Sequence, residues 1–120
     1  MPTGFNCPTL LFQQGGQGGL EVCPGKEART QEWTSVEPAT GVITCNIGDM
    51  LMRWSDDQLP SNFHRLRNPQ PHEYQGDRSS IAFFCQANRS AVIEGLGRMH
   101  PPITAGDYLP QRINANFAKY

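Results

Sequence analysis

Short apolar runs separated by turn residues recur along the chain. Their spacing predicts strands at residues 9–13, 19–23, 32–38, 42–47, 50–55, 63–67 and 79–87. The 120 residues include 12 glycines and 10 prolines, and both residue types destabilise helix interiors. Because many short strands at regular spacing are typical of a sandwich or barrel, we expect a mostly β fold.

The segments between these runs fit antiparallel strand connections. Residues 14–19, QGGQGG, can adopt positive φ at several positions, and residues 38–41, PATG, suit a turn with glycine in last place. We expect Gly48 and Asp49 to join two strands tightly, because an aspartate there can bond its own backbone. Residues 68–77 are polar and predict a longer loop.

The pattern changes near the end of the chain. Thr104 and Asp107 have the spacing of a helix capping box, with aspartate in place of the usual glutamate or glutamine. Pro110 suits the first position of a helix, where its missing N–H is not needed. We therefore expect a turn at 105–108 and a short C-terminal helix from about Pro110 to Phe117.

Length, charge and cysteine spacing narrow the class of protein. A chain of 120 residues suits one domain, and its formal net charge of -1 argues against binding to nucleic acid. The first residues lack a basic segment followed by an apolar one, and no apolar run approaches the roughly 18 residues of a membrane span. We expect no membrane association and a cytoplasmic location. The four cysteines are widely spaced and signal neither a zinc site nor a disulfide framework.

The alternation of side chains along a strand predicts which polar residues share a face. One face carries Asn62, His64 and Leu66, and a face of the later strand carries Arg78, Ser80, Ala82 and Phe84. If the two strands are neighbours with these faces turned inward, His64, Arg78 and Ser80 line one pocket. Such a pocket suits a carboxylate, which a guanidinium binds through two hydrogen bonds. The alternative is a solvent-facing arginine and a hydrogen-bonded histidine.

Three stretches of the chain resemble a known family. They read GVITCNIGDMLMRWSDDQLPSNFHRLRNP, DRSSIAFFCQAN and PPITAGDYL. Together they are similar to the C-terminal half of the iron(II)- and 2-oxoglutarate-dependent oxygenases of the isopenicillin N synthase type. The resemblance implies a double-stranded β-helix, or jelly roll, with residues 1–120 as a single truncated domain. It also implies an iron site made of a His-x-Asp pair and a distal histidine, which leaves positions open for oxygen and cosubstrate.

The family motifs can be placed on individual residues of this chain. His64 matches the distal iron ligand, and Arg78 and Ser80 match the Arg-x-Ser pair that anchors the 2-oxoglutarate carboxylate. Asn46 and Asp49, in NIGD, match the turn that precedes the strand pair. The resemblance therefore implies a cosubstrate- or carboxylate-binding set of Arg78, Ser80 and Asn46.

The early strand departs from the family pattern. Alignment on LLFQ places Pro2 at the histidine and Gly4 at the aspartate of the His-x-Asp pair, and neither side chain can bind a metal. We therefore expect no metal site, with His64 as a remnant ligand and no cofactor. His72 and His100 are expected to be ordinary surface residues.

A second departure concerns the family's long N-terminal region, which has no counterpart before Met1. Its removal is expected to leave apolar sheet surface and an unpaired strand edge exposed. We expect this surface to be covered in a homodimer, or by docking on another protein.

These features favour a binding pocket for a small organic molecule, and a carboxylate would fit it. The chain is interpreted as an oxygenase-derived jelly roll of specialised metabolism that catalyses a non-oxidative step, such as an isomerisation, cyclisation or elimination. His64 would serve as general acid or base, because imidazole titrates near neutrality, and Arg78 would orient a carboxylate. Phe12, Trp54 and Phe84 would form apolar pocket walls.

Two alternatives stay open, so the sequence does not decide whether the chain is an enzyme. The chain could be a catalytically inactive remnant that binds or stabilises another protein. It could also be a fragment of a true oxygenase, in which case iron(II) and 2-oxoglutarate would be its cofactors.

Overall fold

The computed structural model describes residues 4–23 and 32–117 of the chain. Along these residues the elements follow in the order β1 (Pro8–Gln13), β2 (Leu20–Cys23), β3 (Thr34–Ser35), β4 (Ile43–Ile47), α1 (Asp49–Trp54), β5 (Phe63–Leu66), β6 (Ser80–Phe84), β7 (Val92–Ile93), β8 (Ile103–Thr104) and α2 (Ala105–Phe117). The described part is therefore mostly β with a C-terminal helix, as the sequence predicts.

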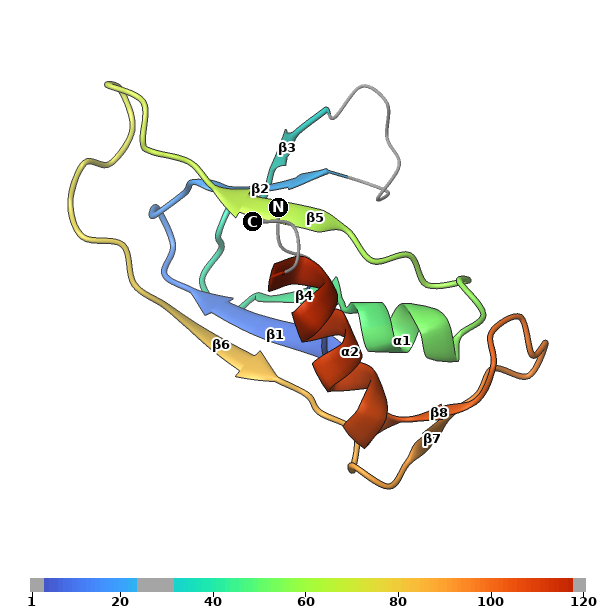
Figure 1. The fold of residues 1–120 in the computed structure, drawn as a ribbon. Helices are drawn as coiled ribbons and strands as arrows, with labels where there is room; N and C mark the ends of the chain where they lie inside the picture. Colours follow the sequence, from blue (N-terminus) through green and yellow to red (C-terminus); the bar gives the residue numbers. More distant parts are fainter. Residues whose placement is uncertain (1–3, 24–31, 118–120) are drawn as a thin grey trace.

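Two three-stranded antiparallel sheets make up the body of the fold (Figure 1). One sheet has the strand order β4-β1-β6 and the other has the order β3-β2-β5. β7 and β8 form a separate antiparallel pair that the apolar pattern does not reveal, because each strand has only two residues. β5 and β6 belong to different sheets, so the condition that these two strands are neighbours is not met.

Residues 50–55, predicted as a strand, lie mainly in helix α1 instead. Met50 and Trp54 are four residues apart, which places them on one helix face. That face packs into the core, a buried cluster of Met50, Ile93, Ala105 and Tyr108, against which Trp54 is partly buried. A short apolar run fits both the two-residue period of a strand and the 3.6-residue period of a helix. Here burial against α2 and β7 selects the helix. Gly48 and Asp49 consequently begin this helix and do not join two strands.

Helix α2 begins five residues earlier than predicted, at Ala105. The predicted capping interaction explains this start. Thr104 Oγ1 accepts a hydrogen bond from the Asp107 N–H at 3.2 Å and donates one to Asp107 Oδ2 at 2.7 Å. The expected turn at 105–108 is therefore the first helical turn, and Pro110 lies inside the helix.

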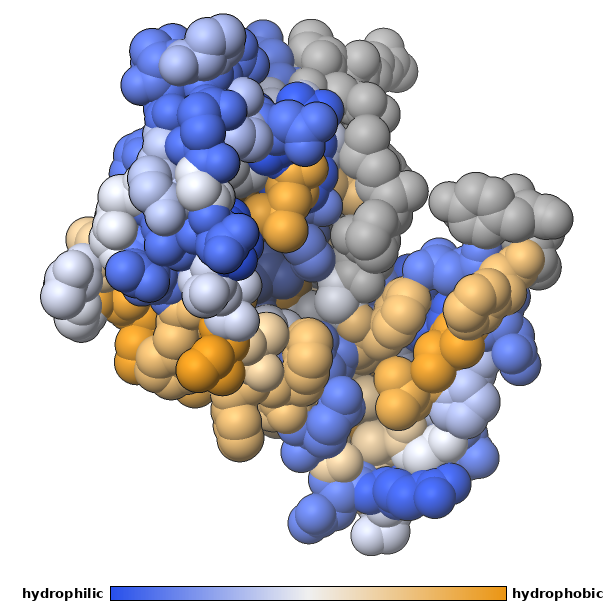
Figure 2. Space-filling view, turned by 90° about the vertical axis from the view of Figure 1, so that its left-hand side faces the viewer, coloured by the Kyte–Doolittle hydropathy of each residue, from blue (hydrophilic) through white to orange (hydrophobic). Residues whose placement is uncertain are grey.

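One face of the β4-β1-β6 sheet carries exposed apolar side chains. The register places Phe12 between Ile43 and Ile81, which are 42%, 49% and 72% exposed. Phe83, two residues along β6, is 58% exposed. Figure 2 shows hydrophobic residues gathered at the lower left of the view, below a hydrophilic region. An exposed apolar sheet face is thus present, whereas the homodimer expected to cover it stays a prediction.

None of the helices among the described residues is long and apolar enough to cross a membrane.

Candidate functional site

A pocket of about 360 Å³ lies between the two sheets. Side chains of β1, β4 and β6 line it from one sheet, and side chains of β2 and β5 line it from the other. Its wall consists of Gly4, Thr9, Leu11, Leu20, Val22, Val36, Thr44, Cys45, Asn46, Asn62, His64, Leu66, Arg78, Ser80, Ala82 and Phe84. This volume falls within the range of small-molecule sites, and the mixture of apolar wall and few polar groups is typical of them.

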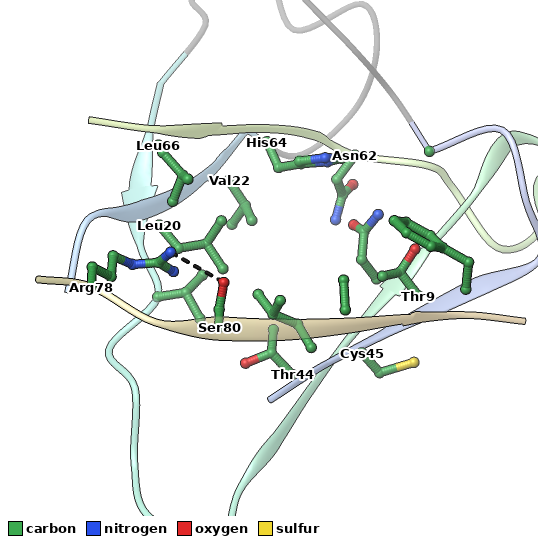
Figure 3. A pocket seen from close by; sticks show the side chains of 16 residues that line it. Thr9, Leu20, Val22, Thr44, Cys45, Asn62, His64, Leu66, Arg78 and Ser80 are labelled. Atoms are coloured by element: carbon green, nitrogen blue, oxygen red, sulfur yellow. Dashed lines mark hydrogen bonds between the residues drawn. The ribbon is translucent and has the colours of Figure 1, made fainter. Parts of the chain in front are cut away.

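Arg78 and Ser80 mark one side of the pocket, which we call the Arg78 end (Figure 3). Arg78 Nη2 donates a hydrogen bond to Gln13 Oε1 at 2.9 Å, and Nη1 donates to Ser80 Oγ at 3.4 Å. Gln13 Nε2 in turn donates to Thr44 Oγ1 at 3.2 Å. The guanidinium is thus held by neutral side chains of β1 and β6, and no carboxylate is its hydrogen-bond partner among the described residues.

Arg78 keeps donor capacity for a ligand. Its Nε is buried and makes no hydrogen bond within the described part of the chain. The neighbouring wall is apolar, because Leu20 and Leu66 lie close to it in Figure 3. A cation beside apolar groups lacks much of its hydration, so an anion that enters would interact strongly with it.

The opposite side of the pocket, which we call the Gly4 end, is lined by residues that include no carboxylate, arginine or lysine. Its members are Gly4, Thr9, Asn46, Asn62 and His64. Figure 3 shows Asn62 and Thr9 on this side, with the ring of His64 pointing toward Asn62. Asn46 Nδ2 and His64 Nδ1 are buried and have no hydrogen-bond partner among the residues that the structure describes. This end therefore offers unused polar atoms.

Backbone hydrogen bonds fix the segment that carries Gly4 onto the start of helix α1. Asp49 N donates to Gly4 O at 2.7 Å, Met50 N to Asn6 O at 3.3 Å, and Gly48 N to Cys7 O at 2.7 Å. The approach is so close that a Cβ on Gly48 would lie 2.1 Å from Asn6 O. Only glycine fits at position 48 without displacing this segment.

An ion pair joins the start of α1 to helix α2. Asp49 is fully buried, and its Oδ2 accepts hydrogen bonds from both Nε and Nη2 of Arg112. Tyr108 donates its hydroxyl to Asp49 O at 3.3 Å, and burial raises the pKa of this phenol. The role of Asp49 in this structure is to hold α1 against α2, and it does not line the pocket.

The described residues do not fit a three-ligand iron site at the Gly4 end. No group of three His, Cys, Asp or Glu side chains that could hold a metal occurs among them. A Cβ on Gly4 would lie 2.9 Å from Asn6 Oδ1, so the Asn6 amide fills the space that a longer side chain would need. Asn6 is held there because its Nδ2 donates to Pro8 O and Thr9 Oγ1, both at 2.9 Å. Pro2 lies outside the described residues.

The structure brings together most of the residues predicted for the site. His64, Arg78, Ser80, Asn46 and Phe84 all line the pocket. The predicted faces are confirmed, because Asn62, His64 and Leu66 of one strand region and Arg78, Ser80, Ala82 and Phe84 of the other are all wall residues. They face each other across the space between two sheets, where the prediction had them on neighbouring strands.

The prediction of Phe12 and Trp54 as pocket walls is wrong. Phe12 follows Leu11 on β1, so it points to the opposite face of the sheet, where it is exposed. Trp54 belongs to helix α1 and packs against the core between the helices. His72 and His100 do not line the pocket either, and His100 Nε2 contacts Asp57 Oδ1 at 3.0 Å.

Sequence reasoning missed Gln13, Asn6 and Asn62 as contributors to the site. Alternation along β1 places Gln13 on the same face as Thr9 and Leu11, so a signal for Gln13 was present. Asn62 lies on the same predicted face as His64, so the same alternation signals it. The position of Asn6 beside Gly4 depends on the path of the chain before β1. No helix or strand periodicity in the sequence specifies that path.

The two facing sheets with a pocket between them match the double-stranded β-helix of known oxygenases. A full-length Neurospora crassa protein, solved in complex with alpha-KG and thymine, has a TM-score of 0.81 and 32% identity, over 96% of this chain and 36% of that one. A sequence profile of the 2OG-Fe(II) oxygenase superfamily matches residues 2–87. The chain belongs to the 2OG-Fe(II) oxygenase superfamily.

Two relatives illustrate the range of the family. The 2-oxoglutarate-Fe(II) type oxidoreductase hxnY of Emericella nidulans is 35% identical over 113 residues, which cover 88% of this chain and 30% of the relative. The homoarginine-6-hydroxylase 2-ODD-233 of Oryza sativa subsp. japonica is 31% identical over 124 residues, which cover 96% and 35%. The chain thus spans about a third of the length of these relatives.

Proposed function

We propose that the pocket binds a small organic carboxylate of the class of 2-oxoglutarate, and that this chain binds it without the iron of its family. The proposal rests on the surroundings of Arg78. Its guanidinium lies on the pocket wall, and its hydrogen-bond partners are neutral. Alpha-KG, which is 2-oxoglutarate, is bound by the related Neurospora crassa protein. Binding without iron is supported because no metal-binding group of side chains occurs among the described residues.

Ser80 supports a carboxylate in the same place. Its hydroxyl lies 3.4 Å from Arg78 Nη1, so one oxygen of an entering carboxylate can accept from both groups. Gln13 holds the guanidinium from the side of β1 and leaves Nε unused. Charge-assisted hydrogen bonds of this kind are about twice as strong as neutral ones.

Calorimetric titration of the EDTA-treated protein with 2-oxoglutarate tests this proposal. Arg78→Met keeps the length of the side chain and removes the charge, and we expect it to weaken binding by about tenfold to a hundredfold. Ser80→Ala is expected to weaken it by a smaller factor. Arg98→Met is the matched control, because Arg98 is 80% exposed and pairs with Glu94 outside the pocket. Equal affinity of the Arg78 variant and the unaltered protein would contradict the proposal.

A non-oxidative step on the bound acid is a second candidate function. His64 favours it, because the ring lines the pocket and Nδ1 is buried without a partner among the described residues. An imidazole so placed can remove a proton next to the carbonyl of a 2-oxo acid and return it. Proton NMR in D₂O would show this as loss of the C3 methylene signal of 2-oxoglutarate. The exchange should stop in His64→Gln, and exchange at the buffer rate in both proteins would exclude the step.

Membership of the oxygenase superfamily favours the alternative that the chain acts as part of an iron(II)/2-oxoglutarate oxygenase. That alternative predicts decarboxylation of 2-oxoglutarate that depends on iron(II) and oxygen. Metal-free binding predicts no such decarboxylation, and the release of CO₂ from labelled 2-oxoglutarate measures the difference.

The exposed face of the β4-β1-β6 sheet supports association with a second copy or another protein. Light scattering with size-exclusion chromatography tests the homodimer. A mass of twice the 13.4 kDa chain is expected, and replacement of Ile81 by Lys should return it to the mass of one chain.

A further inference from the structure

We infer that a second, smaller pocket binds a small organic cation, namely an ammonium group that carries alkyl substituents. This pocket has a volume of about 150 Å³. Its wall consists of Gly16, Gly18, Glu37, Pro69, Glu73 and Tyr74. None of these residues lines the larger pocket between the sheets, so the cation site is separate from the proposed carboxylate site.

Three connecting segments form the smaller pocket. They are the loop between β1 and β2, the segment after β3, and the long polar loop between β5 and β6. Figure 1 shows the first and the last of these at the same end of the two sheets. A Cβ on Gly16 would have no heavy atom within 4 Å, and a Cβ on Gly18 would meet only Glu37 Oε2, at 3.8 Å. The glycines therefore leave open space beside the Glu37 carboxylate.

Glu73 holds the long loop in one shape. The two Nη atoms of Arg67 each donate to one of its carboxylate oxygens at 2.6 Å, and Gln70 N donates to Oε2 at 2.7 Å. Gln75 Nε2 in turn donates to the backbone oxygens of Gln70 and Glu73. This side of the pocket wall is thus ordered before a ligand arrives, which lowers the cost of binding.

The two carboxylates on the wall differ in their charge balance. Glu73 is paired with Arg67, whereas Glu37 forms no ion pair within residues 4–23 and 32–117. The described wall residues include no lysine, arginine or histidine. The negative charge of Glu37 is therefore uncompensated, which favours a cation and disfavours an anion.

Tyr74 adds an aromatic ring to the same wall. The ring lies against Gly76, where a Cβ would be 2.5 Å from Tyr74 Cζ. Tyr74 is 54% exposed, so part of the side chain stays open to a ligand. Aromatic faces attract cations, and quaternary ammonium groups are bound in this way. Calcium takes about six to eight oxygen ligands, so one free carboxylate and a ring suit an alkylated ammonium group better.

The size of the pocket limits the ligand further. Sites for drug-sized molecules measure roughly 300–1,000 Å³, so a pocket of about 150 Å³ suits a head group and not a large molecule. Pro69 contributes apolar surface that can contact the alkyl substituents. The ligand is therefore expected to place a compact, alkylated cation between Glu37 and Tyr74.

Choline and its uncharged carbon analogue, 3,3-dimethylbutan-1-ol, test the inference by NMR titration of the isotope-labelled protein. The two molecules have nearly the same shape and differ in charge. We expect choline to shift the amide signals of Gly16 and Gly18 with a Kd on the order of millimolar, and the alcohol to bind at least about fivefold more weakly. Equal affinities for the two molecules, or no shift of these signals at about 50 mM choline, would overturn the inference.

Glu37→Gln tests the carboxylate, because it keeps the shape of the side chain and removes its charge. It should weaken choline about fivefold and change the alcohol less than about twofold. Glu32→Gln is the matched control, because Glu32 is exposed and lines neither pocket. Equal affinities for choline in the two variants would contradict a role of Glu37.

Tyr74→Leu and Gly18→Val test the place of binding. Loss of the ring should weaken choline about threefold. The two methyl groups of a valine at position 18 would fill the space beside Glu37 and should abolish the choline shifts. Choline binding that persists unchanged in both variants would exclude this pocket, and the amide spectrum of each variant shows whether it is folded. None of these outcomes depends on Arg78, so failure of the proposed carboxylate site leaves this test intact.

Discussion

The two ends of the pocket are held by the fold in different ways. The Arg78 end lies at β6, an edge strand whose five residues are all exposed. The Gly4 end is fastened to α1 by backbone hydrogen bonds, and α1 is fastened to α2 by the buried Asp49 and Arg112. The charged group proposed to bind the ligand thus lies beside an exposed edge strand, whereas the Gly4 end is attached to the packed core.

This difference shows where a substitution in the pocket wall would require neighbouring residues to move. On the exposed strand a residue can be replaced with little effect on its neighbours. At the Gly4 end the side chains are in contact, so the place beside Gly4 is filled by Asn6 and not left empty. We expect local opening to begin at β6 and to reach the Gly4 end only with the core.

The largest effect should follow from Gly48→Ala. The added Cβ would lie 2.1 Å from Asn6 O, so the segment before β1 must move and lose its hydrogen bonds to α1. We expect the free energy of unfolding to fall by about 1–3 kcal/mol in urea denaturation. Gly18→Ala is the matched control, because its Cβ would meet only Glu37 Oε2 at 3.8 Å. Equal losses of unfolding free energy in both variants would show that the close contact between Gly48 and Asn6 is not what holds the Gly4 end to α1.

A smaller effect should connect Gly4 and Asn6. Gly4→Ala places a Cβ 2.9 Å from Asn6 Oδ1 and should cost about 1 kcal/mol, because the Asn6 amide is held by two hydrogen bonds. In an Asn6→Ala background the same change should cost almost nothing. A double-mutant cycle of unfolding free energies measures the coupling, and additive values would show that Asn6 does not fill the space beside Gly4.

The smallest effect should come from the loop beyond β5, away from both ends. Hydrogen bonds from Arg67 and from the Gln70 backbone lower the pKa of Glu73 to about 2, from an ordinary 4.5. Its contribution to stability is therefore present above pH 4.5 and is lost as the pH falls toward 2. The melting temperatures of the unaltered protein and Glu73→Gln should differ slightly at pH 6 and converge near pH 2. A constant difference across this range would exclude the ion pair as its cause.

Strand periodicity predicted much of the fold and of the Arg78 end. The faces that carry His64, Arg78 and Ser80 follow from the two-residue alternation of a strand, which local sequence specifies. The same reasoning failed for residues 50–55, because contact with α2 decides between helix and strand there. It also failed for Asn6, whose effect on Gly4 depends on two short distances that are set by tertiary packing.

The dependence of carboxylate binding on metal tests the central claim most directly. The protein should be titrated with 2-oxoglutarate in EDTA and again with excess manganese(II), a stable substitute for iron(II). If Arg78 holds the ligand without a metal, the two dissociation constants should agree within about twofold. Binding that appears only with the metal, or that tightens tenfold or more, would contradict a metal-free site.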